Sequence, residues 1–545
     1  MKRTKSTLNM AMWLLVSTLI CGSSAVFTSC GNMDNALEEI INANPTAKGI
    51  SFAQSKVAVH FGDDTFTNAL TNKGDGTVTY TSSNTAVATV NPTTGEVTPV
   101  DLGTTTITAT VTESGDYTYE TKTASYELSV GVSILKWDET LKEMKTEEVT
   151  SGVTLTGTID NTTITAGTYI IYDNATITGD VTLTDDVELI LSDGSKLNIT
   201  GQIDGHTNSK ALTIYAQSEG TNMGQLNVEK ANGNAITING LTIHGGKITA
   251  KATTTSQYQH CINMFGNLNI YGGEVKAQGA DNTSNAGYGI NLYVSGTNYT
   301  VNIQNHAKVE VIGGKSTGGH GGIGIRGHVT INDYAELTVT GGDGGSGYGG
   351  DGIYQTLTAS GHAKVKVNGG NGTGSGDVKG GSGIGGVYAT VKDYAQVEVT
   401  GGNGIGNEVG GKAIHDNLNI SGNAYVEATG GNGGTSGNGG DAVGSDLTIS
   451  GNTYVEATGG NGGTSGNGGH AVGNDLNYNG GTFVALGGAK GTSGTNGRAI
   501  DGGLANNTAS SFFEYYDGTN WNNFDVSSGY NFYDQVHSRG VRKLD

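Results

Sequence analysis

Three glutamates recur at one position of a repeated segment in the C-terminal half of the chain. Glu398, Glu427 and Glu456 follow one another at intervals of 29 residues, each between two apolar residues. If the repeats stack as paired strands, equivalent residues lie about 4.8 Å apart. Carboxylates at this spacing repel one another, and a bound Ca²⁺ would relieve the repulsion because hard cations prefer carboxylate oxygens. We expect a solvated acidic face with no metal ion and no cofactor, and a Ca²⁺ site at these three glutamates is the alternative.

An aromatic series accompanies these glutamates. Tyr425 and Tyr454 stand two residues before Glu427 and Glu456, and Phe483 takes the corresponding place in the next repeat. We expect the three rings to form an exposed ladder that serves as a platform for sugars, whose C–H faces pack on aromatic side chains. The alternative is that the rings stack on one another and only stabilise the repeats.

A third series lies in the turn before these strands. Its members are aromatic or polar, namely His306, Tyr334, His362, Tyr394, Asn423 and Asn452. The two histidines are two repeats apart, about 10 Å at the strand spacing, which is too far for them to share one metal ion. This series therefore predicts no metal centre.

All of these residues belong to a repeat that runs through residues 151–506. Each regular unit contains an alternating strand, a tight turn, a second strand, a Gly-rich loop and a short apolar segment. The units begin at residues 300, 328, 356, 388, 417, 446 and 475. Self-similarity at such a period is typical of a solenoid, and three in-register strands per unit resemble a right-handed parallel β-helix. A β-propeller is the alternative, but its blades would need four strands and a longer repeat.

The Gly-rich loop has an internal period of its own. GGNGGTSGNGG occurs unchanged at residues 430–440 and 459–469, with glycine at every third position. Glycine at every third site lets chains with three residues per turn approach closely. We therefore expect polyglycine-II strands that bond laterally from repeat to repeat, with irregular surface loops as the alternative. No proline follows Pro99, which favours ordered β-ladders because proline cannot donate a ladder hydrogen bond.

Enzymes are the main alternative to a binding protein, because many polysaccharide lyases and hydrolases are built on a β-helix. Such lyases typically need clustered aspartates for Ca²⁺ beside an Arg or Lys, and hydrolases need paired carboxylates. Arg326 and Arg498 are the arginines of the regular repeats, and neither shares a column with clustered aspartates. Asp185, Asp186 and His206 are weaker candidates. We therefore expect no catalysis, with a polysaccharide lyase or glycoside hydrolase as the alternative.

Residues 49–131 alternate apolar and polar residues in six short runs, which is the spacing of an all-β sandwich. The segment VTYTSSNTAVATVNPTTGEVTPVDLGTTTITAT at residues 78–110 resembles the bacterial immunoglobulin-like group 2 domain. The shared features are SSN at 82–84, VATV at 87–90, TGEV at 94–97 and Gly103. The resemblance implies a surface module found in adhesins and as a spacer in envelope proteins. We expect a linker at residues 132–150.

The amino terminus has the features of an export signal. Residues 1–29 contain a basic start, an apolar run and a stretch of small residues, which together predict a signal peptide. Cys30 follows Phe-Thr-Ser in a pattern that resembles a bacterial lipobox, so we expect lipidation of Cys30 and a tether at residues 30–48. One fully acylated cysteine suffices for stable membrane attachment. An ordinary secretory peptide cut nearby is the alternative.

Charge excludes one class of partner. The formal net charge is −21, and removal of residues 1–29 deletes three positive charges and no negative ones, which takes it to −24. Such a surface repels nucleic acid. We expect the partners to be a membrane, through the N-terminal lipid, and glycans or surface proteins of a host or of bacteria. The expected location is the cell envelope, at the outer membrane and exposed on the surface.

Two further features concern folding. Cys261 has no partner for a disulfide once Cys30 is acylated, and we expect it to be a small buried residue. After residue 506 the repeat stops, and residues 507–545 are rich in aromatic side chains. Those singled out are Phe512, Phe513, Tyr515, Tyr516, Trp521 and Phe524. A solenoid needs a cap on its last turn, so we expect this segment to be the cap, with an aromatic glycan site as the alternative.

These features predict an all-β protein in which an immunoglobulin-like β-sandwich precedes a right-handed parallel β-helix. The expected function is that of a surface-anchored, non-catalytic lipoprotein that is adhesive or binds carbohydrate. A purely structural surface protein is a further alternative.

Overall fold

The computed structural model describes residues 49–113, 121–253, 258–292, 299–506, 512–517, 519–525 and 538–543. Within these ranges every regular element is a β-strand and no helix is present, which confirms the all-β prediction. This part of the chain therefore holds no helix that could cross a membrane. The expected signal peptide, Cys30 and the tether lie outside the described residues. The chain divides into two compact units, Met1–Val130 and Gly131–Asp545.

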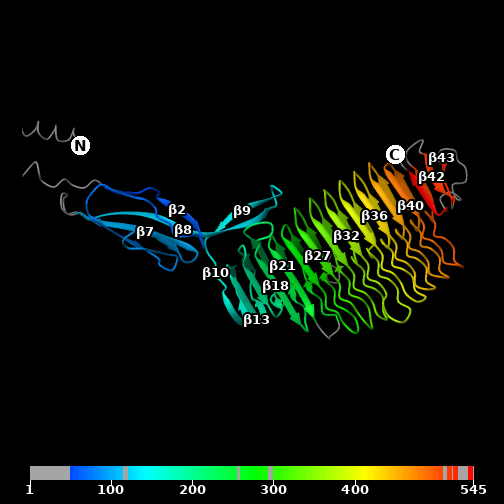
Figure 1. Ribbon diagram of the computed structural model, residues 1–545, viewed down its shortest axis with the longest axis horizontal. Coiled ribbons are helices and arrows are strands. Elements are labelled where there is room, and N and C mark those ends of the chain that lie inside the picture. The colour runs from blue at the N-terminus through cyan, green and yellow to red at the C-terminus, as the bar shows by residue number, and fades with distance from the viewer. Residues whose placement is uncertain are drawn as a thin grey trace, which may run out of the picture. The chain divides into compact units, whose positions relative to one another are not determined.

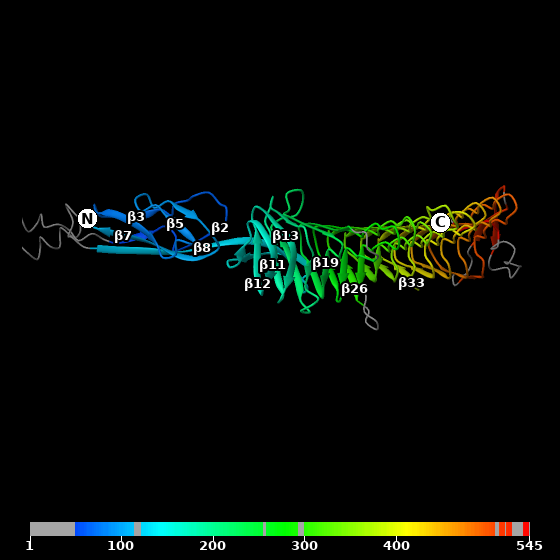
Figure 2. The same ribbon diagram turned by 90° about the horizontal axis from the view of Figure 1, so that it is seen from below.

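The first unit consists of antiparallel strands (Figure 2). They enclose an apolar core that includes Ile107, Tyr126 and Leu128. Its strands are β1 (Ile50–Phe52), β2 (Lys56–His60), β3 (Leu70–Asn72), β4 (Thr77–Ser82), β5 (Ala88–Val90), β6 (Val97–Pro99), β7 (Gly103–Thr112) and the first part of β8 (Thr121–Asp138). β7 pairs with both β4 and β8. The Ser-Ser-Asn motif begins at the last residue of β4, and one hydroxyl contacts all three of its residues. Thr105 Oγ1 hydrogen-bonds both serine hydroxyls and accepts the backbone N–H of Asn84.

The second unit begins with a hairpin rather than a linker. β8 ends at Asp138 and pairs antiparallel with β9 (Glu143–Val149). Residues 132–150, expected to form a linker, are therefore folded into a two-stranded element.

Beyond the hairpin the chain alternates between two long parallel sheets (Figure 1). The first parallel sheet comprises β10 (Val153–Thr154), β12 (Gly167–Ile171), β14 (Val187–Leu191), β17 (Ala211–Ala216), β20 (Gly240–Ile243), β23 (Leu268–Ile270), β26 (Thr300–Ile303), β29 (His328–Ile331), β31 (Leu357–Ala359), β33 (Tyr388–Val391), β35 (Asn417–Ile420), β37 (Leu447–Ser450), β39 (Leu476–Asn479) and β41 (Leu504–Asn506). The second parallel sheet comprises β11 (Gly157–Ile164), β13 (Asn174–Leu183), β15 (Lys196–Ile199), β18 (Gln225–Ala231), β21 (Lys247–Thr253), β24 (Glu274–Gln278), β27 (Lys308–Ile312), β30 (Glu336–Thr340), β32 (Lys364–Asn368), β34 (Gln396–Thr400), β36 (Tyr425–Thr429), β38 (Tyr454–Thr458) and β40 (Thr482–Leu486).

A third, shorter series of parallel pairings completes each repeat. It begins with β16 (Ile203–Asp204), β19 (Ile236–Ile238), β22 (Ile262–Met264), β25 (Ile290–Leu292) and β28 (Ile325–Arg326). It continues as single bridges that join Ile325, Ile353, Ile384, Ile414, Val443, Val472 and Ile500. The apolar segment that follows each Gly-rich loop thus pairs with its equivalent in the next repeat.

The register of the sheets follows the repeat of the sequence. In the first parallel sheet Val301, Val329 and Leu357 are direct partners. Because alternate side chains of each strand point inward, the two sheets and the third series enclose one continuous apolar cluster. Cys261 lies fully buried in this cluster, as expected, and burial raises the pKa of its thiol to about 12.

The tight turn between the two main strands of a repeat uses left-handed backbone conformations. Asn305, Asp333 and Asp393 have φ angles of 56°, 58° and 62°, and Gly422 takes the same place in a later repeat. Asparagine, aspartate and glycine tolerate this region best. The turn therefore points the residue that follows it, such as Tyr334, outward.

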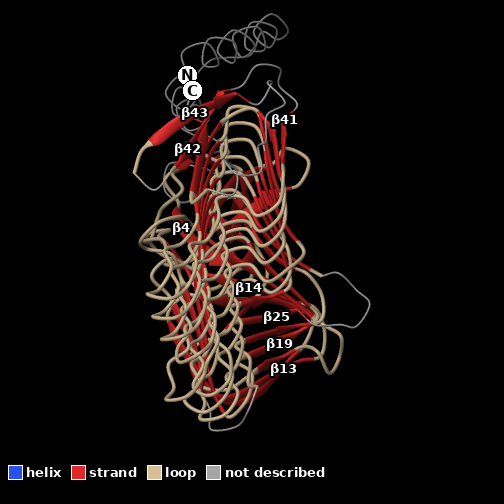
Figure 3. Cartoon of the chain, turned by 90° about the vertical axis from the view of Figure 1, so that its right-hand side faces the viewer, coloured by secondary structure: helices blue, strands red, loops and turns tan. Residues whose placement is uncertain are grey.

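The Gly-rich loops are joined by hydrogen bonds from repeat to repeat, and Figure 3 shows them nested along the stack. Between loops, the N–H of Gly460 donates to the carbonyl of Gly440. Within each loop, the N–H of Gly440 donates to the carbonyl of Gly431 and that of Gly469 to Gly460, each at 2.8 Å. A second zigzag links the remaining glycines of the triplet phase, namely Gly434, Gly437, Gly463, Gly466 and Gly491. The lateral bonding expected from the triplet phase is present, and the loops are not irregular.

Antiparallel strands cover the last repeat. β42 (Phe512–Tyr516) pairs with β43 (Trp521–Asp525) and with β44 (Gly540–Lys543), and β44 in turn pairs with the edge of β40. Phe513 is fully buried against Tyr478 and Phe483. We call these three strands the cap, because they pair with one another and with the edge of the last repeat. The side chains of Phe512 and Phe524 lie outside the described residues.

Candidate functional site

The outward side chains of the second parallel sheet, from its strand β27 to its strand β40, form one face, which we call the outer face. Each strand contributes three outward positions, and register pairing aligns each position into a column. The first column contains Tyr425 and Tyr454, the second contains the three candidate glutamates, and the third contains Thr429 and Thr458. Tyr425, Tyr454 and the three glutamates occupy the columns that the repeat spacing predicts, whereas Phe483 does not.

The tyrosine pair is stacked. The ring centroids of Tyr425 and Tyr454 are 5.3 Å apart, and their planes differ by 3°. Partial burial, together with the neighbouring carboxylates of Glu427 and Glu456, raises the pKa of Tyr425. One face of each ring is covered by the other ring. The remaining faces point toward Gln396 on one side and Thr482 on the other.

Phe483 does not continue this column, and the prediction that it is exposed is wrong. Its side chain is 1% exposed and belongs to the apolar cluster. Its register partner is Val455, whereas Thr482 is the partner of Tyr454. The reason is that the turn before β40 holds two glycines, Gly480 and Gly481, where the preceding repeat has three residues, which moves the following strand by one position.

A longer aromatic series lies beside the tyrosine pair, in the turn before the strands. His306, Tyr334, His362 and Tyr394 stack in order, with centroid separations of 5.5, 4.7 and 4.9 Å and interplanar angles of at most 8°. We call these four residues the turn ladder. Tyr334 and Tyr394 are 56% and 54% exposed. The sequence placed these residues in one column, but only the turn geometry shows that their rings face one another.

The turn ladder and the tyrosine pair form one stepped strip. Tyr394 stands two residues before Gln396, which is the register partner of Tyr425. The tyrosine pair therefore begins one repeat after the turn ladder ends, at a diagonal position on the same face. We call the six residues together the aromatic strip.

The second column, which lies beside the strip, contains lysine–glutamate pairs in the earlier repeats and, among the described residues, glutamates without a lysine partner in the later ones. Lys276 pairs with Glu310 at 3.0 Å, and Lys366 pairs with Glu398 at 2.6 Å. These pairs are half exposed and add little to stability. No ion pair holds Glu427 or Glu456 in the described part of the chain.

The three candidate glutamates do not form a metal cage. Within the described ranges, no group of three His, Cys, Asp or Glu side chains is arranged to hold a metal ion. One of the three, Glu398, is already neutralised by Lys366. The column is thus a partly paired acidic row rather than a convergent ligand set.

The residues considered for catalysis are engaged in separate contacts. Asp185 pairs with Lys210 at 2.9 Å, and Asp186 accepts the backbone N–H of Ala211. His206 stacks on Phe265 with a centroid separation of 3.5 Å. Arg326 lies between two tyrosine rings, and Arg498 pairs with Asp501 at 2.7 Å. Asp185 and Asp186 thus hold one loop at Lys210 and Ala211, whereas Arg326 and Arg498 lie in other repeats.

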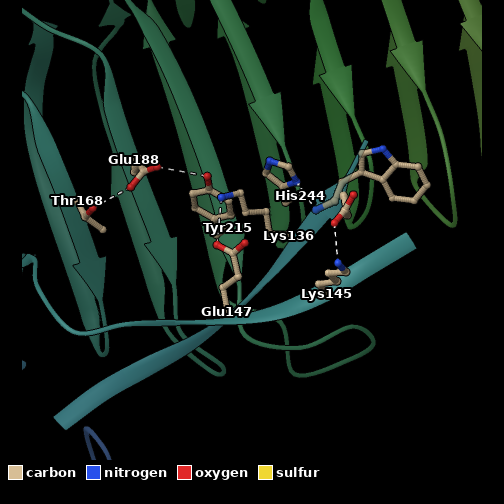
Figure 4. Close-up of polar contacts among 9 residues, drawn as sticks. Lys136, Lys145, Glu147, Thr168, Glu188, Tyr215 and His244 are labelled. Atoms are coloured by element: carbon tan, nitrogen blue, oxygen red, sulfur yellow. Dashed lines mark hydrogen bonds and ion pairs between the residues drawn. The ribbon is translucent and has the colours of Figure 1, made fainter. Parts of the chain in front are cut away.

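The hairpin packs on the first parallel sheet through a buried histidine (Figure 4). His244 Nδ1 accepts the backbone N–H of Trp137 at 2.9 Å, and the imidazole stacks on Tyr215 and Tyr271. Nearby, Lys136 pairs with Glu147 at 3.0 Å. Burial is the main cause that lowers the pKa of His244 to about 4.

Acid is therefore expected to loosen the hairpin. The folded pKa of His244 lies below the ordinary value of 6.5, so its contribution is complete above pH 6.5 and is lost as the pH falls toward 4. The full loss corresponds to roughly 3 kcal/mol, because protonated Nδ1 cannot accept the N–H of Trp137. Thermal unfolding between pH 7 and pH 4 measures this loss. The variant His244→Asn keeps an acceptor that does not titrate, and an unchanged pH dependence in that variant would contradict the assignment.

Comparison with known proteins identifies one segment. Residues 48–121 match the family of bacterial Ig-like domains, group 2. This match confirms an immunoglobulin-like domain near the amino terminus of the described chain. A search of curated proteins finds no match to this protein.

Proposed function

We propose that the protein is a non-catalytic, carbohydrate-binding adhesive lipoprotein. Lipid at Cys30 anchors it to the cell envelope, at the outer membrane and on its external side. The immunoglobulin-like domain acts as a spacer, and the repeats form a right-handed parallel β-helix that displays the binding surface. The in-register parallel sheets and the third series of bridges support this architecture.

The aromatic strip is the observation that carries the proposed function. Exposed aromatic side chains that gather into one contiguous patch are typical of an interaction site, whereas single exposed rings are common on any folded surface. Stacking within the strip covers most ring faces, so a sugar can pack only where a series ends. The free ends are His306 and Tyr394 of the turn ladder, Tyr425 beside Gln396, and Tyr454 beside Thr482.

A glycan array tests this function. The double variant Tyr425→Ala/Tyr454→Ala removes two free ring faces and is expected to weaken binding roughly tenfold or more, as loss of a central aromatic contact does. Tyr334→Ala is the matched control, because both faces of that ring are covered by His306 and His362.

Three outcomes separate the alternatives. Loss of binding in the double variant alone supports the proposal. Cleavage of a uronic-acid polymer with formation of an unsaturated product would assign the protein to the polysaccharide lyases instead. An array without any bound glycan, and no turnover, would leave a structural surface protein.

A further inference from the structure

A second feature of the outer face is a groove at the end of the strands opposite to the aromatic strip. The groove has a volume of about 930 Å³ and crosses six successive repeats, from Thr340 to Leu486. One wall is the third column, which includes Thr400, Thr429 and Thr458. Five steps of about 4.8 Å give it a length of roughly 24 Å.

The opposite wall is a ladder of asparagines. The side-chain oxygen of Asn403 accepts the backbone N–H of Asn432, that of Asn432 accepts Asn461 N–H, and that of Asn461 accepts Ala489 N–H, each at 2.8 Å. Because the oxygen of each amide is used in this way, its NH₂ group is directed away from the ladder. The exposed asparagines therefore present a row of oriented donors, one in each repeat.

The groove is closed at one end by the cap. Tyr516, Trp521 and Arg539 line that end. The guanidinium of Arg542 lies 4.2 Å from the centre of the Trp521 ring, and Tyr516 contacts the same ring. An aromatic wall is thus fixed at the end of a row of hydroxyls and amides.

The charged side chains that line the groove lie at its two ends. Asp343 at the far end is paired with Lys315 at 2.9 Å, and Arg539 at the cap donates from Nε to the carbonyl of Gly487 at 3.2 Å. The middle of the groove is lined by threonine, asparagine and glycine. The glutamate column lies two residues from the threonine column. These carboxylates would repel a polyanion. The hydroxyls of an uncharged ligand could form hydrogen bonds with both the donors and the acceptors of the groove.

We propose that this groove binds one extended, uncharged polysaccharide chain along the direction of the repeats. Threonine hydroxyls and asparagine amides contact successive sugars, whose length is close to the spacing of the repeats, and Trp521 packs on the sugar at the cap. The inference adds a second site and a ligand class to the proposed function and rests on it for the choice of carbohydrate.

Calorimetry with the full-length protein tests the groove. The probes are cellohexaose, mannohexaose and laminarihexaose as neutral chains, the disaccharide of each series, and hexagalacturonate. At least one neutral hexasaccharide is expected to bind. The affinities of the corresponding disaccharide and of hexagalacturonate are expected to be at least tenfold lower. Thr429→Val/Thr458→Val is expected to weaken hexasaccharide binding at least fivefold.

The matched control is Thr330→Val/Thr358→Val, which makes the same change in adjacent repeats of the first parallel sheet. Melting temperatures of both variants show whether the repeats remain folded. Three results would each overturn the proposed groove site. The Thr429→Val/Thr458→Val variant could bind the hexasaccharide as tightly as the unchanged protein does. Hexagalacturonate could bind as tightly as the neutral chains, or no neutral chain could bind. Binding that falls in Tyr425→Ala/Tyr454→Ala but not in Thr429→Val/Thr458→Val would overturn the groove and leave the proposed function intact.

Discussion

Replacing Gly431 and Gly460 together with alanine is expected to destabilise the repeats by about 3 kcal/mol or more. A Cβ atom at either position would lie 1.9 Å from a backbone carbonyl oxygen of the preceding repeat, that of Gly402 or of Gly431. No side-chain rotation can relieve such a contact, so the stacked loops must separate and their hydrogen bonds lengthen. Overpacking of a tight interior costs about 1–3 kcal/mol per site. We expect the melting temperature to fall by roughly 5 °C or more.

Gly376→Ala is the control for this experiment. Gly376 lies in a Gly-rich loop of the same kind, but a Cβ there would have no neighbour within 4 Å, and its φ angle is outside the left-handed region. Its melting temperature is expected to equal that of the unchanged protein. If the Gly431→Ala/Gly460→Ala variant melts like the control, the glycine zigzags do not stabilise the repeats.

Removal of the Phe513 side chain is expected to open the C-terminal end of the repeats. The ring is fully buried between Tyr478 and Phe483, at centroid separations of 5.2 and 5.8 Å. Truncation of a buried phenylalanine to alanine costs about 3–5 kcal/mol. Because each repeat contacts only its neighbours, the loss is expected to stay near the cap.

Hydrogen exchange measures this local effect. In Phe513→Ala, amides of β39 and β40 are expected to lose roughly a hundredfold or more of their protection, whereas those of β27 keep theirs. The exposed edge of β40 should also promote self-association. Asn523→Ala, at an exposed position of β43, is the control. Uniform loss of protection along all repeats would show that the cap stabilises the whole stack instead of its last members.

The repeat and its register could be predicted from the sequence because identical spacing forces equivalent residues into one column. Tyr425, Glu427 and Tyr454 lie where the alternation puts them. Phe483 does not, because the two-glycine turn before it is shorter by one residue, and a one-residue shift in a strand exchanges inside for outside. The shortened turn can be recognised in the sequence. If residues are counted back from the Gly-rich loop, rather than forward from the start of the repeat, Phe483 aligns with Val455, which is an inward position.

Other parts of the site depend on contacts between distant residues. Trp521 and Arg539 of the cap line the same groove as Asn461 of the repeats, and no local sequence pattern predicts that these residues are close together. The hairpin is similar, since the bond from Trp137 to His244 joins residues 107 positions apart. The turn ladder was visible as a column, but its function could not be judged until the ring planes were known.

The glycine zigzags have a consequence for how such a protein evolves. Each loop donates to the preceding loop and accepts from the following one by the same pattern, and two successive loops are identical in sequence. One whole unit of 29 residues can therefore be gained or lost by recombination between the matching gene segments without leaving a mismatched edge. Selection can lengthen or shorten the outer face in steps of one strand spacing, while the cap and the early repeats stay unchanged.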